Sequence, residues 1–484
     1  MVEKDIKKKT IFGMVWTTIE RFGSMAMAFI SNLVLARLLL PSDFGVIGML
    51  HIFIAISGAF MMGGFSGAII QKKHVTQNDY STAFIWNMIL SLLLYILLFF
   101  SAPAISRFYN MPELSSVLRV YGIVLVLVAL GLVQNSILKR ELRFKQLTYR
   151  NLIASFSGLV IGVLFAFLGF RYWSLVASAL MNQLMNVVLV WKISDWRPSL
   201  IFDKQSFKAL FGFGSMLMLT SLVDKVYGNI QGLLIGKWYT AEDLGYYTQA
   251  KKLEDIPTAT LSNIVGTVSF PVFSKFQDDK QKLLDGFRKN IVAITYYNFP
   301  LCILLLIVAK PLIELLYGSK WDASVPYFQL LCVSGMLYTM TTLNSLVIKS
   351  LGRGKLYFSI HLIQRVLGLV FMFVGIGYGV KGLLIAVVIS SFLNYIIYSI
   401  VNSKLLKYGL WSQCKDVISS LLLSVIIGVI VFILGYYSQW NSFLVMGLQI
   451  LLYGLLYYFV SKAMGLEGYQ HSKTVFDILL QNRR

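Results

Sequence analysis

Long apolar runs recur along nearly the whole sequence, from about residue 11 to about residue 463. A helix needs about 20 apolar residues to cross the hydrocarbon core of a bilayer. Within a bilayer, a helix satisfies all of its backbone hydrogen-bonding groups internally. The runs therefore predict an all-α polytopic membrane protein. We place fourteen membrane-spanning helices at residues 11–36, 44–70, 81–102, 117–138, 150–169, 173–193, 207–236, 243–273, 290–309, 325–349, 356–378, 382–403, 416–437 and 442–463.

The composition supports this fold class. The chain is 57% hydrophobic and 13% charged, whereas soluble proteins carry roughly 25% charged residues. The first apolar run exceeds the core of a cleavable signal peptide, which is about 7–15 residues long, and it lacks a small-residue cleavage site. The net charge of +21 would suggest nucleic acid in a soluble protein, but here it fits basic cytoplasmic loops. Nucleic acid is therefore not an expected partner.

The distribution of Lys and Arg predicts the orientation in the membrane. With the N-terminus in the cytoplasm, thirty of the 43 basic residues fall in cytoplasmic segments and eight in outside segments, and the other five lie within helices. Cytoplasmic loops are the ones that accumulate positive charge. We therefore predict that both termini are cytoplasmic, which requires an even number of helices.

An internal repeat relates the two halves of the chain. Because six helices return the chain to the same side, helices 1–6 and 7–12 form two parallel copies, with a substrate site expected between them. We expect an N-lobe at 1–195, a cytoplasmic linker at 196–206, a pseudo-symmetric C-lobe at 207–403, and two further helices with a cytoplasmic tail at 404–484. The matched pairs, 200 residues apart at first and 210 later, are Arg37 and Lys237, Asp43 and Asp243, Gly45 and Gly245, Lys139 and Lys349, Arg143 and Arg353, Lys145 and Lys355, Gly169 and Gly379, and Arg171 and Lys381.

Motifs that would indicate catalysis or a metal site are missing from the sequence. Asp43-Phe44-Gly45 spells a kinase tripeptide without the other kinase elements. Residues 352–355 lack the spacing of a phosphate-binding loop. The three cysteines are scattered and the four histidines form no paired motif, so neither a disulfide framework nor a metal site is indicated. We predict that the chain is not an enzyme and has no cofactor.

Ionisable residues inside the predicted helices are the candidate functional residues. A charge at bilayer depth costs about 2.5–3.5 kcal/mol on insertion scales, and such residues usually face a bundle interior or a water-filled cavity. We therefore place them in a central cavity between the lobes. Their basic excess suits an anionic ligand, because Arg offers a bidentate fork and Lys a point charge. The candidate substrate-binding residues are Arg21, Lys225, Lys251, Lys252, His361 and Arg365, and the candidate ion-coupling residues are Glu20, Asp224, Glu254 and Asp255.

Structural pairing of these charges is the alternative that the sequence leaves open. Lys251 and Lys252 are one helical turn from Glu254 and Asp255, which is the spacing at which side chains on a helix meet. Glu20 or Asp224 could likewise hold Arg365.

Three stretches carry a resemblance to a known family: LARLLLPSDFG at 35–45, GGFSGAIIQKK at 63–73, and LGYYTQAKKLEDIPTATLSNIVGTVSFPVFSKF at 244–276. The chain resembles the polysaccharide transporters of the multidrug/oligosaccharidyl-lipid/polysaccharide (MOP) exporter superfamily. Within that superfamily it looks like the Wzx-type flippases of O-antigen and exopolysaccharide repeat units. The resemblance covers essentially the whole chain, including the plan of two six-helix lobes and two further helices.

The resemblance implies a flippase of the bacterial cytoplasmic (inner) membrane. Such a protein moves undecaprenyl-diphosphate-linked oligosaccharide repeat units for lipopolysaccharide, capsule or exopolysaccharide biosynthesis. It works by alternating access of two lobes around a cationic cavity, with the polyprenyl tail left in the lipid bilayer. The expected partners are a polysaccharide polymerase and glycosyltransferases. We expect a monomer, and the acidic residues suggest proton or sodium coupling.

Three alternatives remain open on the sequence alone. A lipid II flippase of peptidoglycan synthesis shares the architecture and the class of ligand. A cation-coupled multidrug (MATE-like) antiporter would need mainly acidic residues in its cavity, whereas this chain places more basic ones there. A non-transporting scaffold for a polymerase complex is the third.

Overall fold

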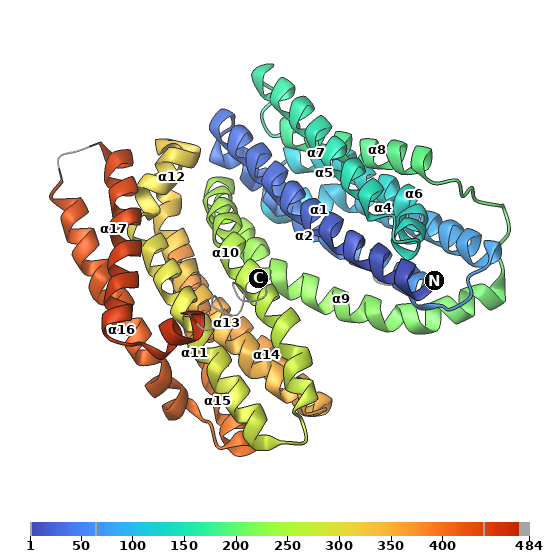
Figure 1. Cartoon of the computed structure of the whole chain (residues 1–484). Coiled ribbons are helices and arrows are strands. Elements are labelled where there is room, and N and C mark those ends of the chain that lie inside the picture. The colour runs from blue at the N-terminus through green and yellow to red at the C-terminus, as the bar shows by residue number, and fades with distance from the viewer. Residues whose placement is uncertain (1, 63–64, 439–440, 474–484) are drawn as a thin grey trace. The chain divides into compact units, whose positions relative to one another are not determined.

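The structure, a computed structural model, describes residues 2–62, 65–438 and 441–473 (Figure 1). Within these ranges it consists of helices and connecting segments, with no β-strand. Thirteen of its helical segments are long and apolar enough to cross a membrane. Twelve of the fourteen predicted helices each correspond to one long helix of the structure, while the second (44–70) corresponds to α2 (Pro41–Met62) and α3 (Phe65–Gln71) and the fourth (117–138) to α5 (Glu113–Tyr121) and α6 (Ile123–Arg140). The seventh predicted helix is α9 (Lys204–Trp238), which is not among those thirteen. The predicted all-α polytopic fold is confirmed, while the cytoplasmic location of both termini stays a prediction.

Contacts within the chain divide it into two compact units, Met1–Gly245 and Tyr246–Arg484. The predicted lobes follow the sequence repeat rather than the contacts, so their boundaries at 195, 206 and 403 stay predictions. The first unit contains α1 (Val2–Leu38), α2 (Pro41–Met62), α3 (Phe65–Gln71), α4 (Gln77–Tyr109), α5 (Glu113–Tyr121), α6 (Ile123–Arg140), α7 (Phe144–Phe167), α8 (Trp173–Ile193), α9 and the start of α10 (Ala241–Lys275). The second contains the rest of α10, α11 (Lys280–Ile307), α12 (Ala309–Tyr317), the 3-10 helix η1 (Ser319–Ser324), α13 (Val325–Ser350), α14 (Gly354–Ile376), α15 (Gly379–Leu406), α16 (Leu410–Tyr436) and α17 (Ser442–Ala463).

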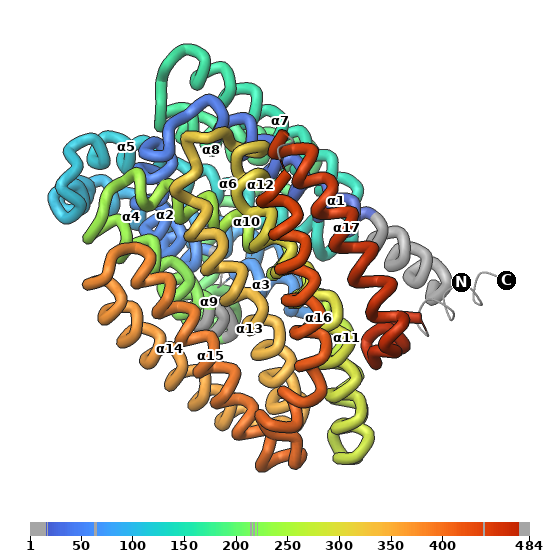
Figure 2. The backbone as a smooth tube through the Cα atoms, turned by 90° about the vertical axis from the view of Figure 1, so that its left-hand side faces the viewer, coloured from blue at the N-terminus to red at the C-terminus, as the bar shows by residue number. Residues whose placement is uncertain are grey.

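Small residues allow the helices of each unit to approach closely. In the first unit α1 and α8 both pack against α7, and a Cβ added at Gly158 of α7 would stand 2.8 Å from the carbonyl oxygen of Ser178 on α8. In the second unit α14 and α15 lie side by side (Figure 2), and a Cβ at Gly375 would stand 2.7 Å from the Gly382 carbonyl oxygen. Such close approach is how membrane helices gain van der Waals contact where lipid offers no hydrophobic driving force.

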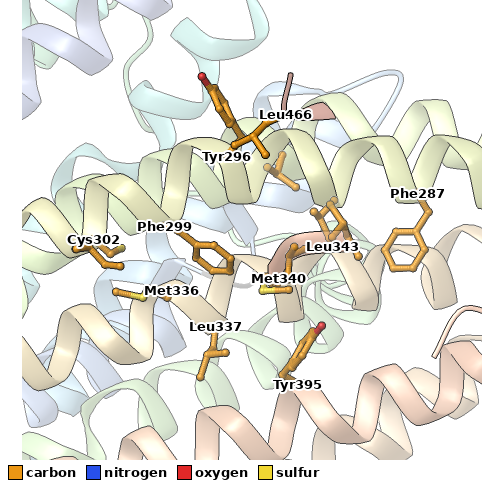
Figure 3. Packing of buried hydrophobic residues seen from close by; sticks show 14 of the residues in the cluster. Phe287, Tyr296, Phe299, Cys302, Met336, Leu337, Met340, Leu343, Tyr395 and Leu466 are labelled. Atoms are coloured by element: carbon orange, nitrogen blue, oxygen red, sulfur yellow. The ribbon is translucent and has the colours of Figure 1, made fainter. Parts of the chain in front are cut away.

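The core of the second unit lies where α11 packs against α13 and α16. Figure 3 shows Phe287 and Phe299 of α11, Leu343 of α13 and Tyr395 of α15, each nearly inaccessible to solvent. The two helices outside the repeat join this core, since α16 packs against both α11 and α17. They are therefore built into the second unit.

Backbone geometry confirms the repeat independently of side chains. The turn after α6 has a left-handed residue at Leu142 (φ 56°), and the turn after α13 has one at Gly352 (φ 68°), 210 positions later. The turn before α8 has Gly169 at φ 81°, and its equivalent Gly379 has φ 80°. Matching left-handed positions at one constant offset indicate that the same turns are used in both copies.

The starts of α2 and α10 are also equivalent. The Asp43 carboxylate accepts a hydrogen bond from the backbone N–H of Leu40 at 3.0 Å. The Asp243 carboxylate accepts from the N–H of Thr240 at 3.3 Å and from its hydroxyl at 2.7 Å. A carboxylate at a helix start satisfies N–H groups that lack a partner within the helix and also complements the helix dipole. This explains why Asp recurs at offset 200.

Two glycines bring these helix starts into contact within the first unit. A Cβ added at Gly45 would stand 2.5 Å from the carbonyl carbon of Ala241, and a Cβ at Gly245 would stand 2.6 Å from that of Pro41. The contact is reciprocal: Gly45 meets Ala241, which is the repeat equivalent of Pro41, and Gly245 meets Pro41 itself. Reciprocal contact between equivalent positions is the signature of a two-fold relation, as a parallel repeat requires.

The predicted linker 196–206 connects α8 to α9 and is fixed to the start of α4. Asp203 also forms the N-cap of α9, because its carboxylate accepts from the N–H groups of Gln205 and Ser206. The linker is therefore an ordered segment of the first unit. Its hydrogen bonds join Trp196 and the Arg197 carbonyl to Gln77, Ser199 to Ser81, and the Asp203 N–H to Thr82.

Candidate functional site

The ten predicted site residues lie on four helices, and each unit holds its own set. The surroundings of the site residues are therefore given unit by unit. The first unit carries Glu20 and Arg21 on α1 and Asp224 and Lys225 on α9, while the second carries Lys251, Lys252, Glu254 and Asp255 on α10 and His361 and Arg365 on α14.

In the first unit, Glu20 belongs to a polar network that joins α1 to α7. The Asn151 amide nitrogen donates to the Glu20 carboxylate. The Asn151 amide oxygen accepts from Arg150 Nε at 3.1 Å and Nη2 at 2.6 Å, and Arg150 Nη1 donates to Asn135 Oδ1 at 3.2 Å. Arg150 is only 8% exposed, so this guanidinium is held among side-chain amides instead of water. A buried charge persists when its hydrogen-bonding groups are satisfied in this way.

Sequence reasoning missed Arg150. The predicted helix 150–169 begins at this residue, which placed it with the cytoplasmic basic residues. The structure begins α7 at Phe144, so Arg150 lies nearly two turns inside the helix. The repeat contained a signal, because Asn151 is the equivalent of His361 at offset 210 and a polar side chain recurs at that position.

Arg21, Asp224 and Lys225 are all exposed in the first unit. One turn beyond Lys225 on α9, Asn229 Oδ1 lies 3.0 Å from the ring nitrogen Nδ1 of His51 on α2. The same Asn229 donates to the Lys225 carbonyl oxygen at 2.8 Å. These hydrogen bonds join α2 to α9 at Asn229 and hold it against the backbone of α9.

In the second unit, Lys251 lies between two carboxylates. Its Nζ is 2.7 Å from Glu254 Oε2 and 2.8 Å from Asp255 Oδ1. Glu254 is 3% exposed, whereas the side chain of Asp255 is 54% exposed. The structure therefore shows the pairing that the sequence left open for Lys251, and the fully ionised cluster carries one net negative charge. The neighbouring Lys252 is exposed.

A polar seam surrounds Glu254 where α10 meets α13. Thr258 and Ser262 follow Glu254 at helical spacing and are also buried, and the Ser262 hydroxyl lies 3.4 Å from that of Thr339. A Cβ added at Gly335 of α13 would stand 2.6 Å from Glu254 Oε1 and 2.7 Å from Thr258 Oγ1. The absence of a side chain at Gly335 thus leaves room for the carboxylate. Sequence reasoning missed this seam, although polar residues at positions 254, 258 and 262 of an apolar helix were its signal.

The two predicted residues on α14 form one pair. Arg365 Nε donates to His361 Nε2 at 3.3 Å. The accepting nitrogen must carry a lone pair, which is the neutral form of imidazole with its proton on Nδ1. In this arrangement the pair carries one positive charge, which is that of the Arg365 guanidinium. Among the residues that the structure describes, no group of three or more His, Cys, Asp or Glu side chains is arranged to hold a metal ion.

Helices long and apolar enough to cross a membrane, arranged in a duplicated set, define a polytopic membrane protein. The chain belongs to the polysaccharide biosynthesis protein family, whose model matches residues 34–326.

Three curated relatives each match more than two thirds of this chain and of their own length. Teichuronic acid biosynthesis protein TuaB of Bacillus subtilis is 28% identical and covers 73% of this chain and 74% of its own length. Lipopolysaccharide biosynthesis protein WzxC of Escherichia coli is 26% identical, with 69% and 68% covered. Succinoglycan biosynthesis transport protein ExoT of Rhizobium meliloti is 25% identical, with 75% and 73% covered.

Two solved structures share the fold. The lipid II flippase MurJ, in an inward closed conformation, aligns with a TM-score of 0.75 at 16% identity and covers 93% of this chain and 98% of its own. An inward-facing multidrug MATE transporter of the MOP superfamily aligns with a TM-score of 0.61 at 15% identity, covering 82% and 100%. At such identities the likeness shows the fold alone.

These comparisons confirm four predictions made from the sequence. The resemblance to polysaccharide exporters of the MOP superfamily is confirmed by the family match and the relatives. The fold is the transporter fold of that superfamily. The chain is a multi-pass membrane protein, in bacteria of the inner membrane, and not an enzyme. The site residues, the coupling ion and the oligomeric state stay predictions.

Proposed function

We propose that the chain is a flippase that translocates undecaprenyl-diphosphate-linked oligosaccharide repeat units across the cytoplasmic membrane for surface polysaccharide biosynthesis. The observation that carries the proposal is the set of relatives. They are named for teichuronic acid, lipopolysaccharide and succinoglycan, which are different sugars, yet they match this chain over comparable lengths. The sugar therefore differs among the relatives, and we propose that the shared part of the substrate is the lipid carrier.

The charges of the chain suit such a ligand. A diphosphate-linked sugar is anionic, and moving it through hydrocarbon requires cations that replace its water. Arg21 and Lys225 are exposed in the first unit, and both lie within helices that the sequence predicts to cross the membrane. Arginine binds phosphate oxygens in pairs, and lysine contributes a compact positive charge. We propose that these residues, with Lys251, Lys252, His361 and Arg365, hold the diphosphate while the two lobes alternate between inward and outward access.

The alternatives differ in the ligand that they require. A MATE-like antiporter binds cations, for which the exposed Arg21 and Lys225 are unfavourable. A lipid II flippase binds a similar anion, and the likeness to MurJ reflects a common fold at 16% identity. The family match favours polysaccharide precursors.

Reconstituted proteoliposomes test the proposal directly. The measurement is the fraction of a radiolabelled undecaprenyl-diphosphate-linked oligosaccharide that becomes accessible to an added, membrane-impermeant glycosidase. We expect transport by the wild type and by Lys280→Ala, which removes an exposed lysine at the start of α11. We expect loss of transport in Arg21→Ala and Lys225→Ala, with normal insertion.

Parallel assays with other ligands separate the alternatives. Transport of lipid II without transport of the oligosaccharide lipid would indicate a peptidoglycan flippase instead. Proton- or sodium-driven efflux of ethidium would indicate a multidrug antiporter. Unchanged transport in both cavity variants would contradict the assignment of Arg21 and Lys225.

A further inference from the structure

We propose that the linker 196–206 is an interfacial binding site for anionic lipids of the bilayer. Its apolar residues Leu200, Ile201 and Phe202 enter the lipid leaflet, and the basic residues on either side bind the lipid phosphates. The ligand is ordinary membrane lipid and not the transported molecule, so this site is independent of the proposed function.

Three consecutive apolar residues of the linker have large exposed surfaces. Leu200 is 99% exposed, Ile201 50% and Phe202 43%. The exposed surface continues onto α9, because the Phe202 ring lies 5.6 Å from that of Phe207, which in turn stacks on the exposed Phe211. A contiguous exposed apolar patch marks a surface that meets a membrane or a protein partner.

Hydrogen bonds fix both ends of this apolar loop, which belongs to the segment joining α8 to α9 in Figure 1. Before the loop, the Ser199 N–H donates to the Ser81 hydroxyl at 3.1 Å, and the two hydroxyls lie 2.8 Å apart. After the loop, the Asp203 N–H donates to the Thr82 hydroxyl at 3.0 Å. Because Ser81 and Thr82 are consecutive residues of α4, the two ends of the loop are held close together.

These anchors place the loop at the edge of the hydrocarbon core. Ser81 and Thr82 are the last residues of α4 before its mainly apolar run, which extends from Ala83 to Phe100. The middle residue of the loop, Ile201, is two Cα–Cα steps of about 3.8 Å from each anchored residue. The headgroup region on each side of a bilayer is about 5–7 Å thick. The exposed apolar side chains are therefore within reach of lipid.

The charges around the loop suit lipid phosphates. Of the two carboxylates nearby in the sequence, that of Asp203 accepts from N–H groups at the start of α9, and that of Asp195 lies 3.9 Å from Arg143. Positive charge is in excess, and basic residues beside apolar ones are the composition with which proteins bind an anionic lipid surface. The exposed basic residues that flank the loop are Lys192, Arg197, Lys204 and Lys208.

Arg197 is held in place by neutral partners. Its Nη1 donates to the carbonyl oxygens of Ser194 at 2.6 Å and Trp196 at 2.9 Å, and its Nη2 donates to that of Trp191 at 3.1 Å. The guanidinium also lies over the Trp191 ring, 5.6 Å from its centroid. These groups fix the guanidinium in the turn after α8 without cancelling its charge, so the charge remains available to a lipid phosphate.

A protein partner is the other surface that such a patch could meet. The anchoring of the loop to Ser81 and Thr82 favours lipid, because it holds the loop at the level where the apolar run of α4 begins. A partner in the aqueous phase would need an apolar surface that projects from the membrane, whereas lipid already surrounds the protein at this level.

Spin labelling of the full chain in nanodiscs tests the position of the loop. One nitroxide is attached at Leu200→Cys or at Asp195→Cys, in a chain that carries Cys414→Ser because the other two cysteines are buried. The two positions are matched, since Leu200 is 99% exposed and the Asp195 side chain 98%. The measurement compares collisions of the nitroxide with oxygen, which concentrates in lipid, and with a water-soluble nickel chelate.

We expect oxygen collisions to dominate at position 200 and nickel collisions to dominate at position 195. Dominant nickel collisions at both positions would overturn the proposal and indicate a loop in water that is open to a protein partner. Protection of position 200 from both reagents would overturn it as well, because the loop would then be covered by the chain itself.

A fluorophore at Leu200→Cys tests the preference for anionic lipid. Its quenching by nitroxide-labelled phosphatidylglycerol is compared with quenching by labelled phosphatidylcholine at the same mole fraction. We expect phosphatidylglycerol to be enriched at the loop, and this enrichment to fall by roughly fivefold for each lysine removed in Lys204→Gln and Lys208→Gln. Lys280→Gln, at the start of α11, should leave it unchanged. Equal quenching by the two lipids in the chain with all its lysines would contradict the role of the basic residues.

Discussion

The contact between the starts of α2 and α10 makes a sharp prediction about two glycines. Replacing Gly45 or Gly245 by alanine adds one methyl group to a place already filled by backbone. The new Cβ at position 45 would stand 2.5 Å from the Ala241 carbonyl carbon, and that at position 245 would stand 2.6 Å from the Pro41 carbonyl carbon. A backbone carbonyl at a helix start cannot rotate away as a side chain can. Each substitution therefore has to push the two helix starts apart.

The expected cost follows from two opposing contributions. Overpacking costs about 1–3 kcal/mol, and a backbone obstacle favours the upper part of that range. Alanine is better than glycine in a helix by about 1 kcal/mol, which offsets part of this. We expect each variant to lose about 1–2 kcal/mol of stability. The double variant should lose less than the sum, because one separation of the helices relieves both clashes and neighbouring sites do not add.

Matched controls lie on the same two helices. A Cβ added at Gly58 of α2 or at Gly266 of α10 meets nothing within 4 Å, so those alanine variants should be neutral or slightly stabilised. The assay is thermal unfolding of the purified protein in detergent, followed by intrinsic fluorescence. Gly45→Ala and Gly245→Ala should unfold at lower temperature than their controls. Equal unfolding temperatures for Gly45→Ala and Gly58→Ala would refute the contact between the two helix starts.

Three further predictions concern polar contacts of Arg140, Asp203 and Arg288. Arg140 donates to three backbone carbonyls at and after the end of α3, at 2.6–2.9 Å. Arg140→Ala should therefore expose the loop that follows α3 to limited proteolysis. Arg140→Lys should not restore protection, because lysine lacks the planar fork of arginine. Hydrogen bonds from Ser206 lower the pKa of the Asp203 carboxyl. The stability that the Asp203 cap adds to the start of α9 is therefore present above the unfolded pKa of Asp203. It is lost as the pH falls through the lower folded pKa. Hydrogen exchange at the start of α9 should accelerate in that acid window, and Asp203→Asn, an equally good N-cap, should remove the dependence. Arg288 pairs bidentately with Asp416 at 2.8 and 3.1 Å. Because Arg288 is half exposed, losing the bidentate pair should lower the stability of the fold by no more than about 1 kcal/mol. Thermal unfolding of Arg288→Lys measures this cost.

Most of the fold was predictable because each helix that crosses a membrane needs a run of about 20 apolar residues. Runs of apolar residues gave the helices, and the repeat gave their pairing into two copies, which the turns at Gly169 and Gly379 match in dihedral angle. The helix α12 and the 3-10 helix η1 were not predicted. Both are shorter than a membrane span and lie where the sequence analysis places a loop, so hydropathy over a window of about 20 residues cannot detect them.

The candidate site was predictable where it depends on one helix and not where it depends on two. The spacing of Lys251, Glu254 and Asp255 indicated a pairing because all three share a helix. The space that Gly335 leaves for Glu254 depends on α13 approaching α10, and the two residues are 81 positions apart in the sequence. Arg150 was missed for a third reason: a helix start placed six residues late moved a buried charge into a loop. The late helix start therefore changed the environment assigned to Arg150.

The paired charges also narrow the place where an anion would first bind. Lys251 is shared between two carboxylates, and Arg150 is enclosed by the amides of Asn135 and Asn151. Neither cation is fully available to a ligand in this structure. The basic excess that the sequence predicts for the cavity therefore falls, within the first unit, on the exposed Arg21 and Lys225. Under the proposed function, Arg21→Ala should therefore weaken the binding of undecaprenyl diphosphate to the full chain in nanodiscs more than Lys251→Ala does, and equal losses in the two variants would contradict this reasoning.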